Sequence, residues 1–285
     1  MRFSIVARMR DIFDRMMVIS DVDGTLLDSE TYSSIAATPA LEALKKNGAC
    51  LVLASSKTRA ELEPICNRLN LAAPFIVENG GALYIPVGFF RAPLDGTTAR
   101  GAYEIVEFGT PYARLRTALK DIASIIGTDV KGFGDMTIEE IAERTGLTYD
   151  EAMLAKQREY DEPFVLPNEA FLDSVRREAA LRGLTCTKGG RFHHLLGLND
   201  KGTACRFLIQ CCRREVAASQ GRLYTIGIGD SANDLPLLAA VDQPILVQKP
   251  DGSYDLAGQL PHVRYAPGIG PSGWNAAVLT ILKGA

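Results

Sequence analysis

Short, nearly continuous apolar runs recur in the first 90 residues of the chain and again after residue 220. This pattern is typical of strands that are covered on both faces of a sheet, since strands with one face in water alternate apolar and polar residues. Helical segments and polar loops separate the runs, which predicts a βαβ rhythm and a doubly wound parallel sheet of the α/β class. The predicted strands are MVIS (17–20), CLVLAS (50–55), FIVEN (75–79), LYTIGIG (223–229) and PILVQ (244–248).

The segment TPALEALKKNG, between the first two predicted strands, carries the end signals of a helix. Thr38 suits the N-cap position, where a side-chain oxygen accepts a backbone hydrogen bond. Pro39 suits the first turn because its missing N–H has no helical partner there, and Gly48 suits the stop after the last turn. The sequence therefore predicts a helix that begins after Thr38 and ends before Gly48.

The βαβ rhythm is lost between about residue 90 and residue 195. The elements predicted there are a strand at YEIVEF, a helix at 111–126, helices that begin with capping boxes at Thr137 and Thr148, a strand at PFVLP, a helix at 168–182, and strands near LTCTKG and RFHHLLG. Strands and helices without regular alternation are typical of an α+β domain. We therefore expect an N-terminal extension at 1–15, a core at 16–91 and 197–285, and an inserted α+β domain at 92–196.

Composition and charge narrow the possible functions. The chain has 285 residues, of which 47% are hydrophobic and 23% charged, and a net charge of −3 at pH 7. This globular composition excludes a mainly disordered chain, and the weak acidic excess provides no basic field for nucleic acid or a membrane surface. No apolar run approaches the roughly 18 residues of a spanning helix, and none suits a secretory signal. The six cysteines lack the paired spacings of zinc sites, so we expect reduced thiols and a cytoplasmic protein.

Acidic residues follow two predicted strands at their carboxyl ends, where open parallel sheets bind ligands. Asp21 and Asp23 follow the first strand, and the motif GDSANDLPLL, which contains Asp230 and Asp234, follows the strand LYTIGIG. Two acids two positions apart on an extended segment point the same way, and their charges repel unless a cation lies between them. Oxygen ligands of this kind suit Mg²⁺. We therefore expect Asp21, Asp23, Asp230 and Asp234 to form a magnesium site.

The first acid pair also suits the chemistry of phosphoryl transfer. A carboxylate can attack phosphorus and form an aspartyl-phosphate that water later hydrolyses. Asp21, which comes first after its strand, would be this nucleophile. Asp23 would protonate the leaving oxygen and then deprotonate the water.

A phosphate bound at these acids also needs hydrogen-bond donors. Ser55 follows the second predicted strand and would donate to a phosphate oxygen, with Ser56 as the adjacent alternative. Lys201 opens a predicted helix whose dipole also favours an anion, which makes it the best candidate for the phosphate-binding lysine. Lys57 and Lys188 are competitors, and the spacing leaves this choice open.

These motifs, taken in order, resemble those of the haloacid dehalogenase-like phosphatase superfamily. They are DVDGT, a serine after the second strand, a lysine that opens a later helix, and GDSANDLPLL. The resemblance spans the chain from residue 17 nearly to its end, and it implies a Rossmann-like core and a Mg²⁺-dependent phosphatase. The insertion is similar to the large α+β cap of the sugar-phosphatase branch, which closes over the substrate and determines specificity.

A narrower resemblance is to the mannosyl-3-phosphoglycerate phosphatases. It rests on the segments ASSKTRAELEPI, PFIVENGGALYIP, GFGDMTIEEIAERTGL, AKQREYDEPF, KGGRFHHLLGLNDKG and GPSGWNAAV. It implies a small phosphorylated sugar-glycerate as substrate and the compatible solute mannosylglycerate as product. It also implies that substrate is bound at the end of the third strand and on the cap. The implied substrate-binding residues are Glu78, Asn79, Gly80, Gly81, Lys188, Gly189, Gly190 and Arg191.

Two other functions fit some of the same residues. One is a broader sugar phosphatase of the same superfamily, including one that acts on glucosyl-3-phosphoglycerate. The other is a phosphoacceptor module that keeps its aspartyl-phosphate as a switch. Asp23 disfavours the switch because an acid two positions past the nucleophile is placed to speed dephosphorylation, and a large insertion has no obvious use in such a module.

Three further residues invite a structural or a functional interpretation. His193 and His194 are adjacent on a predicted strand, so their side chains point to opposite faces and one of them faces inward. Packing and a substrate hydrogen bond are both open for that residue. Trp274, in the segment PSGWNAAV, is expected to pack in the core rather than stack on a sugar.

Overall fold

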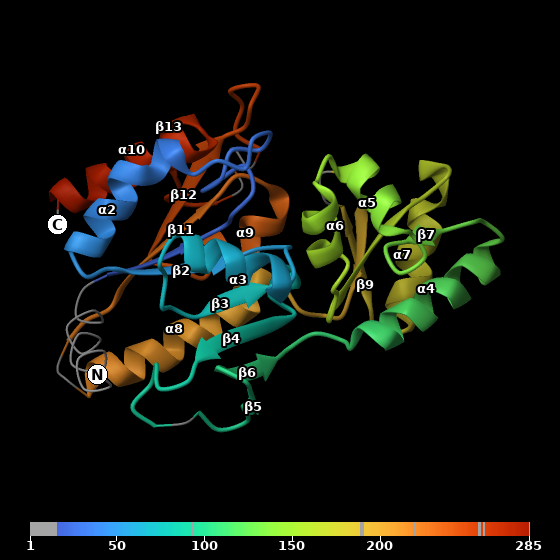
Figure 1. Ribbon diagram of the computed structural model, residues 1–285, viewed down its shortest axis with the longest axis horizontal. Helices are drawn as coiled ribbons and strands as arrows, with labels where there is room; N and C mark the ends of the chain where they lie inside the picture. Colours follow the sequence, from blue (N-terminus) through green and yellow to red (C-terminus); the bar gives the residue numbers. More distant parts are fainter. Residues whose placement is uncertain are drawn as a thin grey trace.

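The computed structural model describes residues 16–92, 94–188, 191–218, 221–255, 258 and 260–284. Within these residues the chain forms a nine-stranded sheet and a separate four-stranded sheet, which lie side by side in Figure 1. The predicted extension at 1–15 lies outside the described residues. The strands of the large sheet are β1 (Met16–Ser20), β2 (Cys50–Ala54), β3 (Phe75–Val77), β4 (Ala82–Pro86), β5 (Thr98–Arg100), β6 (Tyr103–Glu107), β11 (Tyr224–Gly229), β12 (Gln243–Gln248) and β13 (Arg264–Ile269).

The large sheet has the order β13-β12-β11-β1-β2-β3-β4-β6-β5. The strands from β13 to β3 are parallel, as predicted for this α/β chain, and β4, β6 and β5 extend the sheet by antiparallel pairing. The strand YEIVEF, which we expected inside the insertion, is β6 and pairs with β4. The predicted boundary at residue 92 is therefore too early, because residues 98–107 complete the large sheet.

Helices cover both faces of the large sheet because β1 divides its side chains between two hydrophobic clusters. Met16 and Val18 pack with α2, α3 and α10, whereas Met17 and Ile19 pack with α8 and α9. This alternation explains why the first four residues of the strand are all apolar. The helices are α2 (Thr38–Lys46), α3 (Arg59–Arg68), α8 (Lys201–Ala217), α9 (Leu235–Leu238) and α10 (Gly270–Gly284).

The ends of α2 follow the sequence signals only in part. Pro39 lies in the first turn, and Gly48 has a φ of +67° just beyond the C-cap Asn47, as predicted. The N-cap is Ala37 rather than Thr38, and it makes no side-chain cap. The reason is that a 3₁₀ turn, η1 (Ile35–Ala37), runs directly into the helix.

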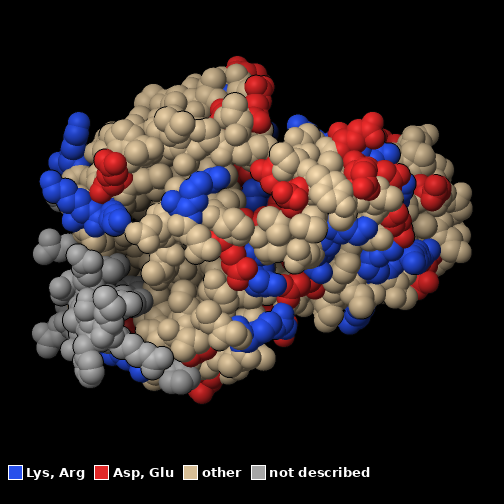
Figure 2. All heavy atoms as spheres, viewed as in Figure 1, with Lys and Arg blue, Asp and Glu red and all other residues tan. Residues whose placement is uncertain are grey.

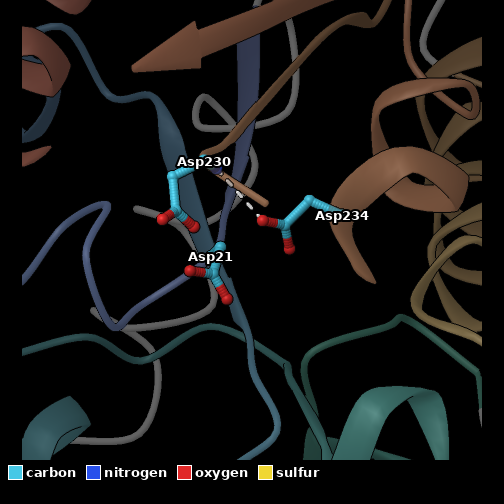
Figure 3. Close-up of side chains that lie close together, drawn as sticks. All are labelled: Asp21, Asp230 and Asp234. Atoms are coloured by element: carbon cyan, nitrogen blue, oxygen red, sulfur yellow. Dashed lines mark hydrogen bonds between the residues drawn. The ribbon is translucent and has the colours of Figure 1, made fainter. Parts of the chain in front are cut away.

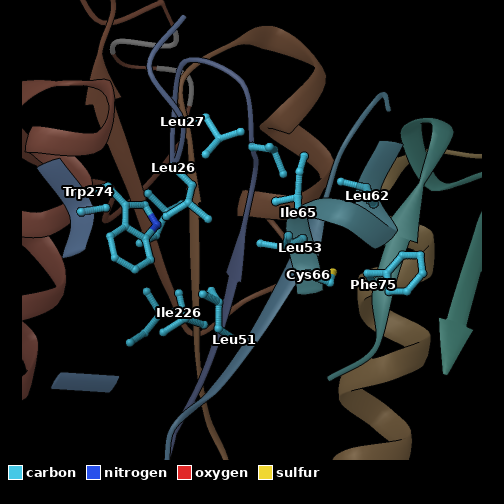
Figure 4. Packing of buried hydrophobic residues seen from close by; sticks show 14 of the residues in the cluster. Leu26, Leu27, Leu51, Leu53, Leu62, Ile65, Cys66, Phe75, Ile226 and Trp274 are labelled. Carbon is cyan, nitrogen blue, oxygen red and sulfur yellow. The ribbon is translucent and has the colours of Figure 1, made fainter. Parts of the chain in front are cut away.

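Trp274 connects α10 to the end of β1. Its ring is fully buried in the cluster shown in Figure 4, which confirms the expected packing role. The indole N–H donates to Ser20 Oγ at 3.0 Å, and the Ser20 hydroxyl donates to the carbonyl of Asp21 at 2.6 Å. A core tryptophan therefore fixes the backbone at the point where β1 ends.

The small sheet has the order β7-β8-β10-β9. One of its faces packs against α4 and α7, which lie on the side away from the large sheet in Figure 1, and other side chains pack with α5 and α6. The capping boxes predicted at Thr137 and Thr148 are both present at the starts of α5 and α6. The elements are α4 (Tyr112–Ile126), β7 (Lys131–Gly132), α5 (Ile138–Thr145), α6 (Tyr149–Ala155), β8 (Asp161–Val165), α7 (Leu172–Leu181), β9 (Thr185–Lys188) and β10 (His193–Leu196).

The helix predicted at 168–182 is divided. A 3₁₀ turn, η3 (Glu169–Phe171), precedes α7, and the Asn168 side chain caps that turn. None of the helices in the described part of the chain has both the length and the apolar character that a membrane crossing requires.

Replacing Trp274 by alanine tests its role in the core. We expect Trp274→Ala to lower the free energy of unfolding by about 3–5 kcal/mol, because a large buried ring is lost and a cavity remains. Urea denaturation followed by circular dichroism measures the change. Val87→Ala is the matched control, since Val87 is exposed and such a change costs less than about 0.5 kcal/mol. Equal stability of the two variants would contradict this role.

Candidate active site

Three aspartates from distant parts of the sequence meet at the carboxyl ends of β1 and β11. Asp21 follows β1, Asp230 follows β11, and Asp234 ends the 3₁₀ turn η4 (Ala232–Asp234). One carboxylate oxygen from each lies within 4.8 Å of the others. Figure 3 shows the three side chains converging on one place. The two strands are parallel neighbours, and the Asp21 N–H donates to the carbonyl of Ile228 at 2.9 Å. Strand pairing therefore brings together acids that are about 200 positions apart.

A buried lysine lies between two of these acids. Lys201 is the first residue of α8, and its Nζ donates to Oδ1 of Asp21 and to Oδ1 of Asp234, each at 2.6 Å. Asp200 caps the helix by accepting from the Thr203 N–H, which fixes where the helix begins. Burial alone would lower the pKa of Lys201, but the two carboxylates raise it. The side chain is therefore charged at neutral pH.

One ammonium group does not balance three carboxylates. Burial and the nearby Asp234 hold the pKa of Asp21 well above its usual range, although Lys201 opposes them. Burial and Asp234 also raise the pKa of Asp230 to about 6. The cluster can hold its full negative charge at neutral pH only if a further cation joins it. Three hard carboxylate groups are a donor set that fits a divalent metal ion.

The turn after β1 is shaped to fit against Asp230. Gly24 has a φ of +73°, which side-chain-bearing residues rarely adopt, and a Cβ there would lie 3.0 Å from Asp230 Oδ2. Thr25 is buried, and its hydroxyl donates to Asp230 Oδ1 at 3.5 Å. The Gly-Thr pair in DVDGT therefore allows the backbone to approach the acid cluster.

Asp23 has a separate partner. Its Oδ2 pairs with Lys57 Nζ at 3.0 Å, and the same ammonium lies 5.0 Å from the centre of the Tyr32 ring. The second oxygen, Asp23 Oδ1, is buried and has no partner in the described residues. We expected Asp23 to be a fourth metal ligand, but its carboxylate lies outside the three-acid cluster because Lys57 binds it. Its free oxygen is available to a ligand.

The two candidate serines lie in the loop after β2. Ser55 is buried, and its Oγ accepts from the backbone N–H of Lys57 at 3.2 Å. The carbonyl of Ser55 accepts from the Asn79 N–H at 3.0 Å, which ties the loop to the end of β3. The carbonyl of Ser56 instead accepts from Arg158 at 2.8 Å. The loop therefore joins both sheets.

The predicted cap residues are not all brought to the acids. Lys188 shares a strand face with Cys186, which packs against α4 and α7, so Lys188 points away from the large sheet. Residues 189–190 lie outside the described residues. Arg191 is exposed and lies beside the turn at Gly146, between α5 and α6. Of the three candidate lysines, Lys201 alone reaches the acid cluster.

Glu78 joins the two sheets. It directly follows β3 and is fully buried, and its carboxylate accepts from the backbone N–H of Glu159 at 2.9 Å and of Tyr160 at 2.8 Å. Burial raises its pKa to about 8, although Arg158 and the backbone donors oppose this. The Glu78 carboxylate therefore contacts the segment before β8, and the expected contact of Glu78 with substrate stays a prediction.

Close backbone packing explains the two glycines that follow. Gly80 has a φ of +86°, and a Cβ there would lie 2.0 Å from the carbonyl oxygen of Asp200. A Cβ on Gly81 would lie 2.4 Å from the Cβ of Tyr160. Larger residues at either position would push the loop before α8 or the segment before β8 away. These glycines therefore allow the close packing of the junction.

Asn79 continues the junction toward the acid cluster. Its amide donates to Asp161 at 3.2 Å, and its Oδ1 accepts from the Asn233 amide at 3.3 Å. Asp161 is fully buried, pairs with Arg158 at 3.7 Å and accepts from His194. Sequence reasoning missed this network. The signal for it is the charged run in AKQREYDEPF directly before an apolar strand, where buried charges need partners.

Exposed ion pairs complete the junction. Glu159 pairs with Arg59 at 3.3 Å and with Arg100 at 2.7 Å. Figure 2 shows basic and acidic side chains interspersed where the two parts of the molecule meet. Since such pairs each contribute little stability, the buried Glu78 and Asp161 contacts carry the greater weight.

Comparisons with known proteins identify the family. A family model described as haloacid dehalogenase-like hydrolase matches residues 18–88. A protein of Methanococcoides burtonii, named glucosyl-3-phosphoglycerate/mannosyl-3-phosphoglycerate phosphatase, is 46% identical over 93% of this chain and 97% of its own. The chain belongs to this phosphatase family. A mannosyl-3-phosphoglycerate phosphatase of Pyrococcus furiosus is 36% identical over 81% of this chain and 90% of its own.

A solved structure from Bacteroides thetaiotaomicron, described as a phosphatase of the haloalkanoate enzyme superfamily, has the same fold. It superposes with a TM-score of 0.65 at 16% identity and covers 95% of this chain and 96% of its own. The recognition of the superfamily, the α/β fold and the phosphatase class from the sequence is confirmed. The roles of individual site residues stay predictions.

Glu78→Gln tests the buried carboxylate at the junction. The pKa of Glu78 is raised from 4.5 to about 8, so between these values the folded protein holds a proton that the unfolded chain releases. The stability that this proton contributes is present at low pH and is lost as pH rises toward 8. We expect the fall in Tm between about pH 5 and pH 8 to be smaller in Glu78→Gln than in the wild type.

Thermal unfolding at a series of pH values measures this effect. Glu42→Gln, on the exposed side of α2, is the matched control because it makes the same chemical change outside the junction. It should reproduce the wild-type curve. If Glu78→Gln also reproduces that curve, the carboxylate does not titrate as described.

Proposed function

We propose that this protein is a Mg²⁺-dependent phosphomonoesterase that hydrolyses mannosyl-3-phosphoglycerate to mannosylglycerate and inorganic phosphate. The observation that carries the proposal is the three-acid cluster bridged by Lys201, with Asp23 beside it holding a free oxygen. The substrate is supported by the names of relatives that match nearly the whole chain, including the small sheet. The product would be mannosylglycerate, the compatible solute that the resemblance in the sequence implies.

In this proposal Asp21 is the nucleophile. Its carboxylate oxygen forms a bond to phosphorus while the bond from phosphorus to the glycerate oxygen breaks, which leaves an aspartyl-phosphate. Asp23 gives its proton to the departing oxygen through Oδ1, the atom that has no protein partner. Water then attacks phosphorus and loses a proton to Asp23, so that phosphate leaves and both acids return to their first state. Lys57 holds Asp23 in place through Oδ2.

Lys201 and Ser55 would hold the phosphate. The Lys201 ammonium is 2.6 Å from the nucleophilic carboxylate, close enough to meet a phosphate oxygen bound there. Asp21, Asp230 and Asp234 would hold Mg²⁺, which when bound supplies positive charge to offset the charge of the transferring group.

We propose that the small sheet and its helices, about residues 109–199, act as the cap that determines specificity. The junction of Glu78, Asn79 and Arg158 holds this part against the loops that carry the acids. The substrate is then a small molecule bound between the two sheets. A cytoplasmic location is supported by the six cysteines, which are all buried and unbridged and so suit a reducing compartment.

A second candidate is a phosphatase that accepts glucosyl-3-phosphoglycerate equally well. The relatives from Methanococcoides burtonii and Persephonella marina, 46% and 40% identical, are named for both substrates. Comparison of kcat/KM for the two substrates separates the candidates. A cap whose side chains contact the sugar would bind one of the two substrates better and so give it the higher kcat/KM. Equal values would favour the second candidate.

Asp21→Asn tests the nucleophile. We expect kcat for phosphate release from mannosyl-3-phosphoglycerate to fall at least about a thousandfold, since an amide does not attack phosphorus. Asp28→Asn makes the same change seven residues along, at an acid that caps a surface turn by accepting from Glu30 and Thr31, and should keep full activity. Full activity of Asp21→Asn would exclude the covalent route.

The metal site predicts a pH-dependent affinity for Mg²⁺. The raised pKa of Asp230, about 6, means that protons compete with the metal below that pH. We expect the Kd for Mg²⁺ to increase as pH falls below 6, by about tenfold per pH unit for each ligand carboxylate that takes up a proton. Isothermal titration of the full chain measures it. An affinity that does not vary with pH would contradict the assigned ligands.

A further inference from the structure

Tyr32 lies in the loop after β1 and contacts the lysine that pairs with Asp23. The loop turns here, because the Tyr32 N–H donates to the carbonyl of Asp28 at 3.0 Å. Lys57 Nζ lies over the Tyr32 ring, 5.0 Å from the ring centre. The Tyr32 hydroxyl makes no hydrogen bond within the described part of the chain, so the ring makes the contact.

Tyr32 holds an uncommon backbone conformation. Its φ is +53°, in the left-handed region that a bulky residue seldom adopts. Such a conformation persists only where the surroundings fix it, and it is common at functional sites. The ring is therefore kept over Lys57 at a cost in backbone free energy.

Three groups that attract a cation surround the Lys57 ammonium. Asp23 Oδ2 lies 3.0 Å from Nζ, Glu61 Oε1 lies 3.5 Å from it, and the Tyr32 ring faces it. These groups match the three N–H donors of an ammonium in number. The Lys57 side chain is 11% exposed, so little water competes with them.

The third contact fixes the ammonium in place. Glu61 is held in the capping box of α3, where its other oxygen accepts from the Thr58 N–H at 2.8 Å. Burial alone would lower the pKa of Lys57, but Asp23 and Glu61 raise it, so the side chain is charged at neutral pH. Two acids alone leave the flexible lysine stem free to turn about the line between them, and the ring removes that freedom.

We propose that Tyr32 is a positioning residue whose ring holds the Lys57 ammonium on Oδ2 of Asp23. Lys57 then stays with the proton donor instead of moving to the phosphate, and Oδ1 of Asp23 stays free for the leaving oxygen. This rests on the proposed function, in which Asp23 protonates the departing glycerate oxygen.

The test uses three variants of the full chain. Tyr32→Phe keeps the ring and loses the hydroxyl, whereas Tyr32→Leu keeps an apolar side chain without an aromatic face. Tyr224→Leu is the matched control, because Tyr224 is 39% exposed and begins β11, at the end of the strand opposite the acids. Circular dichroism and Tm establish that all three variants are folded.

We expect Tyr32→Leu to lower kcat/KM for mannosyl-3-phosphoglycerate by about 3- to 30-fold, the range that a partly buried cation–π contact provides. Tyr32→Phe and Tyr224→Leu should stay within about twofold of the wild type, since neither removes that contact. Wild-type activity in Tyr32→Leu overturns the proposal. An equal loss in Tyr32→Phe also overturns it, because the hydroxyl would then be the active group.

A double-mutant cycle tests whether Tyr32 acts through Lys57. Tyr32→Leu is combined with Lys57→Met, which removes the ammonium and keeps an unbranched side chain. In that background Tyr32→Leu should change kcat/KM by less than about twofold, since its partner is already absent. The same loss in both backgrounds overturns the proposal, because it would indicate a direct contact with substrate or a structural effect.

The leaving group gives a readout that a general structural effect would not move. The glycerate oxygen must take a proton as it departs, whereas p-nitrophenolate is a stable anion that needs none. Tyr32→Leu should therefore lower kcat/KM for p-nitrophenyl phosphate by less than about twofold. Equal losses for the two substrates would overturn the link to Asp23.

A separate measurement distinguishes failure of this inference from failure of the proposed function. The wild type is assayed for phosphate release from mannosyl-3-phosphoglycerate. Release by the wild type together with an undiminished kcat/KM in Tyr32→Leu overturns only the inference. Absence of release overturns the proposed function, and with it the inference.

Discussion

The buried ion pairs of Lys201 are the interaction on which the rest of the site depends. Asp21 and Asp234 could not lie so close together in a low-dielectric interior without a cation between them. The lysine can reach them because α8 begins where the chain returns from the small sheet to the large one. The lysine that pairs with Asp21 and Asp234 thus stands directly after the segment that forms the small sheet.

The charges around the site are arranged in two sets. Lys201 serves the acids that would hold metal and phosphate, and Lys57 serves Asp23, the proposed proton donor. This separation leaves Asp23 with one bound and one free oxygen, which a general acid requires, and it gives the metal cluster a cation that does not fully neutralise it. Each lysine thus supports a different step of the proposed hydrolysis.

Much of the fold and part of the site could be predicted from the sequence. Apolar strands, capping boxes and acids at strand ends are local signals, so β1, β11 and the positions of Asp21 and Asp230 followed from them. The junction could not be predicted in this way, because the partners of Glu78 are backbone N–H groups 81 and 82 positions away that carry no sequence signature. For the same reason the sequence at 78–81 suggests a substrate site, whereas in the structure its glycines allow close backbone packing.

The hydrogen bonds of Glu78 to backbone N–H groups leave its partner positions free to change in sequence. Its carboxylate accepts hydrogen bonds from the backbone N–H groups of Glu159 and Tyr160 and not from their side chains. Changes of these two side chains therefore do not remove either donor. The side chains at these two positions can therefore vary while the contact between the two sheets is kept. A contact made through the backbone thus constrains the sequence at its partner positions less than a contact made through side chains would.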